Sequence, residues 1–375
     1  MLKSILPQTI LITTILLYNT RISLSWSCHN PKSTTSLQAS TSISSEQENA
    51  VGPTCTTVST KDVLSLESIR SSLIRQEETI VFALIERSQY RTNPIVYQKG
   101  GFGDLGTPLG ATPTDDDELL SFCEYMMLGT EILHWSVRRY TSPEENAFFP
   151  ERLPKDDSKQ ILSPLDYPSL LDESIDNNFS SILYKRYVSE ILPSIALEGD
   201  DEQHGSSALG DINVLQALSK RVHYGKFVAE SKYRSDPQEY QRLVDNNDVD
   251  GVMKLLTNAA VEKKVLRRAK LKAATYGREP LLADYPSIDE NENSSTTSIA
   301  AAAAAAVVAA VDAISKENQE ESNTKVDPAV IESVYKDIII PLTKIIEVAY
   351  LFRRCGKEPP KGYTPDTICD DWLRI

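Results

Sequence analysis

Apolar residues recur every three to four positions along most of the chain, which predicts long helices. Between residues 63 and 85, leucine, isoleucine and valine follow the spacing of one helix face. No region is rich in strand-like patterns. The expected fold class is therefore all-α, a single large helical-bundle domain. Further helices are predicted at about residues 117–140, 175–196, 207–234, 236–246, 248–277 and 328–354.

The first sixty residues have a different character. Residues 1–25 contain Lys3, a short apolar stretch and the small residues Ser23-Leu24-Ser25, which is the pattern of a secretory signal peptide. Half of residues 33–60 are Ser or Thr, so 26–60 is predicted to be a transit-like or disordered segment. Together they predict delivery to a plastid (chloroplast); plain secretion is the alternative.

The remaining chain is expected to form one domain, 61–356, followed by a loose tail at 357–375. Residues 279–327 interrupt this domain with a low-complexity insertion, and its middle, Ala300–Val311, is almost pure Ala and Val. Alanine favours helix, but this run is too short to cross a membrane. We assign the insertion no function and expect no membrane association of the mature form.

Composition excludes several classes of function. The net charge of −14 argues against a nucleic-acid partner, because phosphate binding needs a basic face. The five cysteines form no CxxC pair, and there are only four histidines, so no metal site is expected. An anionic small molecule would still need arginine or lysine placed locally.

Several polar residues are spaced so that they share a helix face. Each pair alone is usually a surface ion pair or hydrogen bond. Glu347 differs because its neighbours in sequence are strongly apolar, which would raise its pKa. The pairs are Arg70–Glu77, Arg221–Lys232, Asn258–Glu262 and Thr343–Glu347.

Several separated segments resemble members of one known family and occur along the chain in the family's order. The segments Ser219–Tyr233, Leu256–Glu262 and Ile340–Arg354, with Leu66–Arg70 and Ile85–Ser88 upstream, resemble the helices of all-helical eukaryotic (fungal and plant) chorismate mutases. The resemblance spans about 63–354, apart from the insertion. It implies an isomerase and a homodimer that converts chorismate to prephenate in phenylalanine and tyrosine biosynthesis, without any cofactor.

The resemblance also assigns roles to the cations and to the buried acid. By it, Arg70 and Arg221 bind the two substrate carboxylates, and Lys232 points at the breaking ether oxygen. Glu347 shares that oxygen and must be protonated to donate. Such a reaction needs orientation and preorganised charge rather than a nucleophile.

The resemblance implies three further catalytic residues and one supporting residue. Thr343 would fix the carboxylate end of the substrate. Glu262 and Asn258 would meet its hydroxyl. Glu77 would not contact the substrate but would orient an active-site arginine.

Regulated members of the family bind tyrosine or tryptophan at the dimer interface. The matching positions are Arg138 and Arg139, expected at the end of the second helix, and Gly205 and Ser206, expected in an acidic loop. Leu209 departs from the pattern, because fungal members carry a hydroxyl there. The two arginines could instead complement the dipole of a helix end.

Two other functions fit parts of the pattern. One is a non-catalytic helical dimer that senses aromatic amino acids. The other is a secreted chorismate mutase. A bifunctional enzyme is not expected, because no GxGxxG follows a strand.

Overall fold

The computed structural model of the chain describes residues 64–113, 119–164, 170–172, 175, 177–278 and 324–368. The chain divides into two units, and all of these residues lie in the unit Thr60–Ile375. The expected signal peptide, the transit-like segment, residues 279–323 of the insertion and residues 369–375 of the tail lie outside the described residues.

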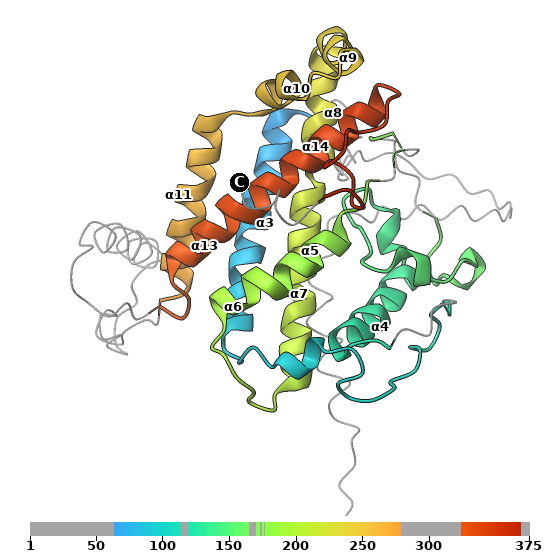
Figure 1. Cartoon of the computed structure of the whole chain (residues 1–375), viewed down its shortest axis with the longest axis vertical. Helices are drawn as coiled ribbons and strands as arrows, with labels where there is room; N and C mark the ends of the chain where they lie inside the picture. The colour runs from blue at the N-terminus through green and yellow to red at the C-terminus, as the bar shows by residue number, and fades with distance from the viewer. Residues whose placement is uncertain are drawn as a thin grey trace, which may run out of the picture. The chain divides into compact units, whose positions relative to one another are not determined.

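The described residues confirm the all-α class (Figure 1). They form no strand beyond one isolated bridge between Arg278 and Thr324. The longer helices are α3 (Leu66–Ser88), α4 (Phe122–Ser136), α5 (Ser180–Arg186), α7 (His204–His223), α8 (Gly225–Ser235), α9 (Pro237–Asp245), α10 (Val249–Leu256), α11 (Ala259–Tyr276), α13 (Pro328–Val334) and α14 (Ile340–Arg354). Short elements join them: η2 (Pro94–Tyr97), η3 (Arg139–Thr141), η4 (Pro150–Arg152), η5 (Asp157–Lys159), η6 (Tyr187–Ile191), α6 (Leu192–Ile195) and η8 (Tyr335–Ile339).

Several predicted boundaries are wrong. Helix α7 begins at His204, so Gly205 and Ser206 lie in its first turn and not in an acidic loop. Helix α4 ends at Ser136, so Arg138 and Arg139 lie beyond it, and Arg138 has the left-handed φ of 59°. The two arginines therefore do not belong to the last turn of that helix.

The helix predicted at 248–277 is two helices. The chain turns at Asn258, which has φ −130° and ψ 94°, and its side-chain oxygen accepts a hydrogen bond from the backbone N of Val261 at 3.2 Å. Asparagine is a strong N-cap, because it satisfies a backbone donor that the first turn leaves free. This cap sets where α11 begins.

Prolines inside two helical runs produce π-helical turns rather than breaks. Pro193 follows η6 and Pro341 follows η8, and both turns are π-helical. Proline lacks an N–H and clashes with the carbonyl four residues earlier, so the ladder widens there. The carbonyl of Asp337, four residues before Pro341, accepts from Arg186 Nη2 at 3.5 Å instead. The predicted helix at 328–354 therefore stays continuous.

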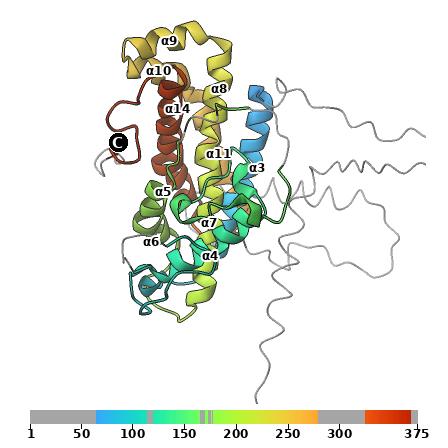
Figure 2. The ribbon, with the colours of Figure 1, turned by 90° about the vertical axis from the view of Figure 1, so that its right-hand side faces the viewer.

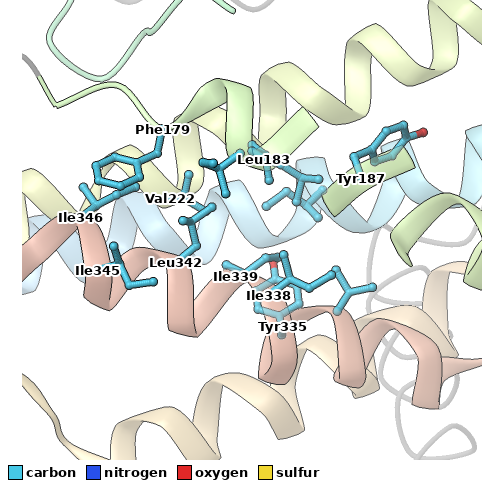
Figure 3. Close-up of a cluster of buried hydrophobic side chains, with 14 of the residues drawn as sticks. Phe179, Leu183, Tyr187, Val222, Tyr335, Ile338, Ile339, Leu342, Ile345 and Ile346 are labelled. Atoms are coloured by element: carbon cyan, nitrogen blue, oxygen red, sulfur yellow. The ribbon is translucent and has the colours of Figure 1, made fainter. Parts of the chain in front are cut away.

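Helix α14 runs through the core. Ten of its fifteen residues are buried, including Thr343 and Glu347. Figures 1 and 2 show it alongside α8 and crossing α7. In Figure 3, Leu342, Ile345 and Ile346 pack with Val222 of α7 and with Phe179, which directly precedes α5. A helix that is apolar nearly all round is a buried one.

The two ends of the insertion are tied together beside α11. The backbone N of Lys325 donates to the carbonyl of Gly277 at 3.0 Å, next to the bridge between Arg278 and Thr324. Val326 is buried, and α13 packs on α11 directly afterwards. The chain therefore leaves and re-enters the bundle at one place.

The expected loose tail packs more closely than predicted as far as residue 368. Lys357 donates to the carbonyls of Val244 and Asp245 at 3.1 and 2.8 Å, and Tyr363 is buried. Within the described ranges, no helix is both long and apolar enough to span a bilayer.

A buried ion pair joins α3 to α7. Arg87 Nε lies 2.5 Å from Asp211 Oδ1, and both side chains are completely buried. The hydroxyls of Tyr97 and Tyr187 also donate to Asp211, each at 2.5 Å. Arg87 in turn donates to the carbonyls of Tyr90 and Arg91. This network fixes the chain that follows α3 against α7.

We predict that Asp211→Asn lowers the free energy of unfolding by about 3–5 kcal/mol, because it leaves Arg87 buried without a counter-charge. Urea denaturation measures this. Glu239→Gln is the control, because it removes the exposed partner of Arg242 and should leave the midpoint unchanged. Equal losses in the two variants would contradict the prediction.

Candidate active site

Charged side chains from five helices gather around the middle of α14. Arg70 comes from α3, Arg221 from α7, Lys232 from α8, Glu262 from α11 and Glu347 from α14. Their charges influence one another: Glu347 responds to Lys232, Arg221 and Glu262, and Lys232 responds to Arg70. The structure thus brings these five predicted site residues together.

Glu347 is the acid at the centre of this cluster. Its side chain is buried, and burial raises its pKa to about 7, although Lys232 and Arg221 act to lower it. Desolvation disfavours the carboxylate more than the nearby cations favour it. The direction of this shift agrees with the one predicted from the apolar sequence neighbours, and a protonated, donating carboxyl group is accessible near neutral pH.

Lys232 is held at the end of α10. Its Nζ donates to the carbonyl oxygens of Leu256 and, at 3.4 Å, Leu255. Carbonyls at a helix C-terminus are free to accept and carry partial negative charge. Burial lowers the pKa of Lys232, while Glu347 opposes that shift and Arg70 adds to it. The ammonium is therefore anchored beside the cluster.

Arg221 is buried beside Tyr335 of η8. Burial lowers its pKa, and Tyr335, Glu77 and Glu347 oppose the shift. Neither Arg221 Nε nor the Tyr335 hydroxyl has a hydrogen-bond partner in the part of the chain that the structure describes. Buried donors without partners are costly, so a ligand acceptor would be stabilised here.

Glu77 orients an arginine that sequence reasoning missed. Its two oxygens each accept from Arg268 of α11 at 2.6 Å, and Lys272 lies 3.5 Å away. Such a bidentate pair fixes the guanidinium plane. Arg268 and Lys272 are four residues apart on one helix face, which was the available signal.

Glu262, Thr343 and Asn258 each have a partner within the protein. Lys344, which sequence reasoning also missed, lies 2.9 Å from Glu262. The Thr343 hydroxyl is buried and donates to the Ile339 carbonyl at 2.6 Å. Asn258 is exposed, and its side-chain oxygen serves as the α11 cap.

No group of acidic, histidine and cysteine side chains among the described residues is arranged to hold a metal ion.

Comparison with known proteins decides the family. The family model "Chorismate mutase type II" matches residues 207–348. Chloroplastic chorismate mutase 1 of Arabidopsis thaliana is 36% identical over 298 residues, which are 79% of this chain and 76% of that protein. The chain belongs to the chorismate mutase family.

Solved structures of the family share the fold. Aro7p chorismate mutase of Candida albicans, in complex with L-Trp, is 37% identical with a TM-score of 0.60, covering 80% of this chain and 95% of that one. AtCM1 with tyrosine in its allosteric site is 34% identical with a TM-score of 0.57, covering 78% and 97%. The sequence-based assignment to all-helical chorismate mutases is confirmed.

The positions that correspond to the family's effector residues are not assembled within one chain. Arg139 contacts His134 and Gln216 and pairs with Glu145 at 3.1 Å. Gln216 lies ten residues after Ser206 along α7, or about 15 Å of helix. Arg139 is thus next to the second half of α7, whereas Gly205 and Ser206 are at its start.

Proposed function

We propose that the charged cluster around Glu347 is the catalytic site of a chorismate mutase and rearranges chorismate to prephenate. The observation that carries this proposal is a buried carboxyl group, that of Glu347, among cations supplied by α3, α7 and α8. A dianionic substrate with an ether oxygen at its centre needs this combination. Cations bind its carboxylates, and a neutral acid donates to the oxygen.

The reaction breaks one carbon–oxygen bond and forms one carbon–carbon bond within the same molecule. The enzyme therefore accelerates it by holding the reactive conformer and by stabilising charge that grows on the ether oxygen. Arg70 and Arg221 are assigned to the two carboxylates, and a guanidinium can clamp each through parallel hydrogen bonds. Arg221 Nε and the Tyr335 hydroxyl have no hydrogen-bond partner among the described residues, which supports the assignment of Arg221 to one of the two carboxylates.

Lys232 and protonated Glu347 are assigned to the ether oxygen. Glu262 and Asn258 are assigned to the substrate hydroxyl, and Thr343 to the fixed end of the substrate. Glu77 holds Arg268, which lies close enough to influence Arg221. These residues would be preorganised by packing and do not have to reorganise during the reaction.

The full-length protein is expected to convert chorismate to prephenate, measured as consumption of chorismate. Arg221→Ala should lower kcat/KM by at least about 100-fold, because a preorganised donor to developing charge is lost. Arg267→Ala is the matched control, because this arginine is exposed on α11. An inactive parent protein, or equal rates in the two variants, would overturn the proposed function.

The pH dependence follows from Glu347. Its folded pKa is raised above the ordinary value, so the neutral, donating form predominates below about pH 7 and is lost above it. Because kcat/KM reports groups of the free enzyme, it should fall as pH rises through about 7. Glu347→Gln should be slower at low pH but flat over that range. A glutamine variant with the parental profile would exclude this role.

We infer that two chains complete an effector site for tyrosine or tryptophan. Arg139 and its neighbour Arg138 lie beside the second half of α7, too far from Gly205 and Ser206 at its start to share a ligand within one chain. A partner subunit would therefore have to supply one pair. Exposed leucines on the helices involved support an isologous contact: Leu133 of α4 is 68% exposed and Leu209 of α7 is 47% exposed. The relatives with tryptophan or tyrosine bound support the ligand class.

This regulation is tested by light scattering and by the mutase rate with added tyrosine or tryptophan. We expect a dimer and a changed rate with at least one of the two. Leu209→Thr supplies the hydroxyl that fungal members carry, so it should strengthen the response. A monomer, or no response by either protein, would contradict the regulatory proposal while leaving catalysis intact.

We propose plastid delivery through residues 1–60. The signal-like start and the Ser/Thr-rich segment support it, as does the chloroplastic Arabidopsis relative. A fluorescent fusion of residues 1–60 should accumulate in plastids, and export from the cell would favour the secreted alternative.

A further inference from the structure

Gly225 is the first residue of α8 and lies against the two catalytic candidates on α14. A methyl group placed on it would lie 3.0 Å from Thr343 Cγ2, 3.1 Å from the Thr343 carbonyl oxygen and 3.2 Å from Glu347 Cγ. All three distances are shorter than ordinary carbon contacts. The absence of a side chain at position 225 therefore sets how closely α8 approaches α14 here.

The backbone gives no other reason for glycine at this position. Gly225 is helical and does not have the positive φ that the chain's turn glycines adopt, such as Gly199 and Gly356. Glycine at an ordinary helix position is less favourable than alanine. What requires glycine is the space between the two helices.

The close packing of α8 against α14 also positions Lys232. Gly225, Ala229 and Lys232 are spaced four and three residues apart, so they lie on one face of α8, and Ala229 is completely buried. Lys232 and Glu347 are close enough that each shifts the other's pKa. The small residues let this face lie close to α14, and Lys232 extends from it into the cluster.

A second contact prevents the helices from sliding past one another. Buried Glu230 of α8 accepts from the Tyr350 hydroxyl at 2.9 Å and from Arg354 Nε at 3.1 Å, both on α14. The Arg354 guanidinium also lies 4.6 Å from the ring centroid of Tyr233. Because this second contact holds the two helices together further along, a methyl group at 225 would displace Thr343 and Glu347 themselves.

We propose that Gly225 is a positioning residue of the mutase reaction: its lack of a side chain seats Glu347 at its buried place opposite Lys232. The proposal rests on the proposed function. In this arrangement the glycine does not touch substrate. It determines how deeply the carboxyl group of Glu347 is buried, and therefore whether that group is protonated when substrate arrives.

The test is Gly225→Ala in the full-length protein. We expect kcat/KM to fall by about 10- to 100-fold, mainly through kcat, because a small misplacement of a catalytic group is costly. The fall of kcat/KM with pH should move to lower pH, because a displaced Glu347 is better solvated. The thermal midpoint should stay within about 5 °C, since alanine's helix preference offsets part of the crowding.

Gly210→Ala is the matched control. A methyl group there would meet Arg87 Cδ at 3.0 Å, an equally close contact far from the cluster. It should lower the thermal midpoint but leave the pH at which activity falls unchanged. Thr343→Ser removes the Cγ2 atom that the new methyl group would meet. Gly225→Ala should therefore lower kcat/KM by a smaller factor in a Thr343→Ser background than in the parent. The double variant carries the test if the single variant does not fold.

An active parent whose Gly225→Ala variant keeps both its kcat/KM and its pH profile would overturn this proposal. A lower kcat/KM with an unmoved pH profile and no rescue by Thr343→Ser would do so as well, because it would make the glycine structural only. A parent that does not consume chorismate would overturn the proposed function instead, so the two failures are distinguishable.

Discussion

The burial of one carboxyl group among cations is the constraint on which the rest of the arrangement depends. Glu347 lies on the most buried helix of the bundle, and loss of water raises its pKa even though Lys232 and Arg221 favour the charged form. Burial outweighs the cations, and the resulting pKa of about 7 leaves the group near half-protonation at neutral pH. Neither a more open site nor a site without cations would leave it there.

The bundle supplies that environment by combining polar contacts with apolar packing. Glu77 with Arg268, Glu230 with Tyr350 and Arg354, and Asp211 with Arg87 are all acids buried beside their partners. Each acid lies on one helix and its partners include a residue of another, so the contacts fix how neighbouring helices are placed. Buried pairs add little net stability but penalise any arrangement that separates them. The apolar face of α14 provides the stability, and the pairs provide the register.

Sequence alone predicted much of this and missed specific parts. Apolar spacing predicted the helices around α3, α7 and α14, and the family blocks identified Arg221, Lys232 and Glu347. Arg268 was missed because its partner Glu77 is 191 residues away, and no local pattern records such a contact. The cap at Asn258 was missed because the apolar spacing continues through it. Arg138 has a left-handed backbone conformation, but it is neither the glycine nor the asparagine that would have indicated a helix end in the sequence.

The short junction between Gly277 and Lys325 has an evolutionary consequence. Because the two chain segments at that junction are hydrogen-bonded to each other, α11 and α13 keep their spacing whatever is inserted between them. The entropy of closing a loop grows only with the logarithm of its length. The intervening stretch can therefore be lengthened, shortened or replaced during evolution at little cost in folding free energy. Such changes would have little effect on catalysis, so selection for activity would not remove them.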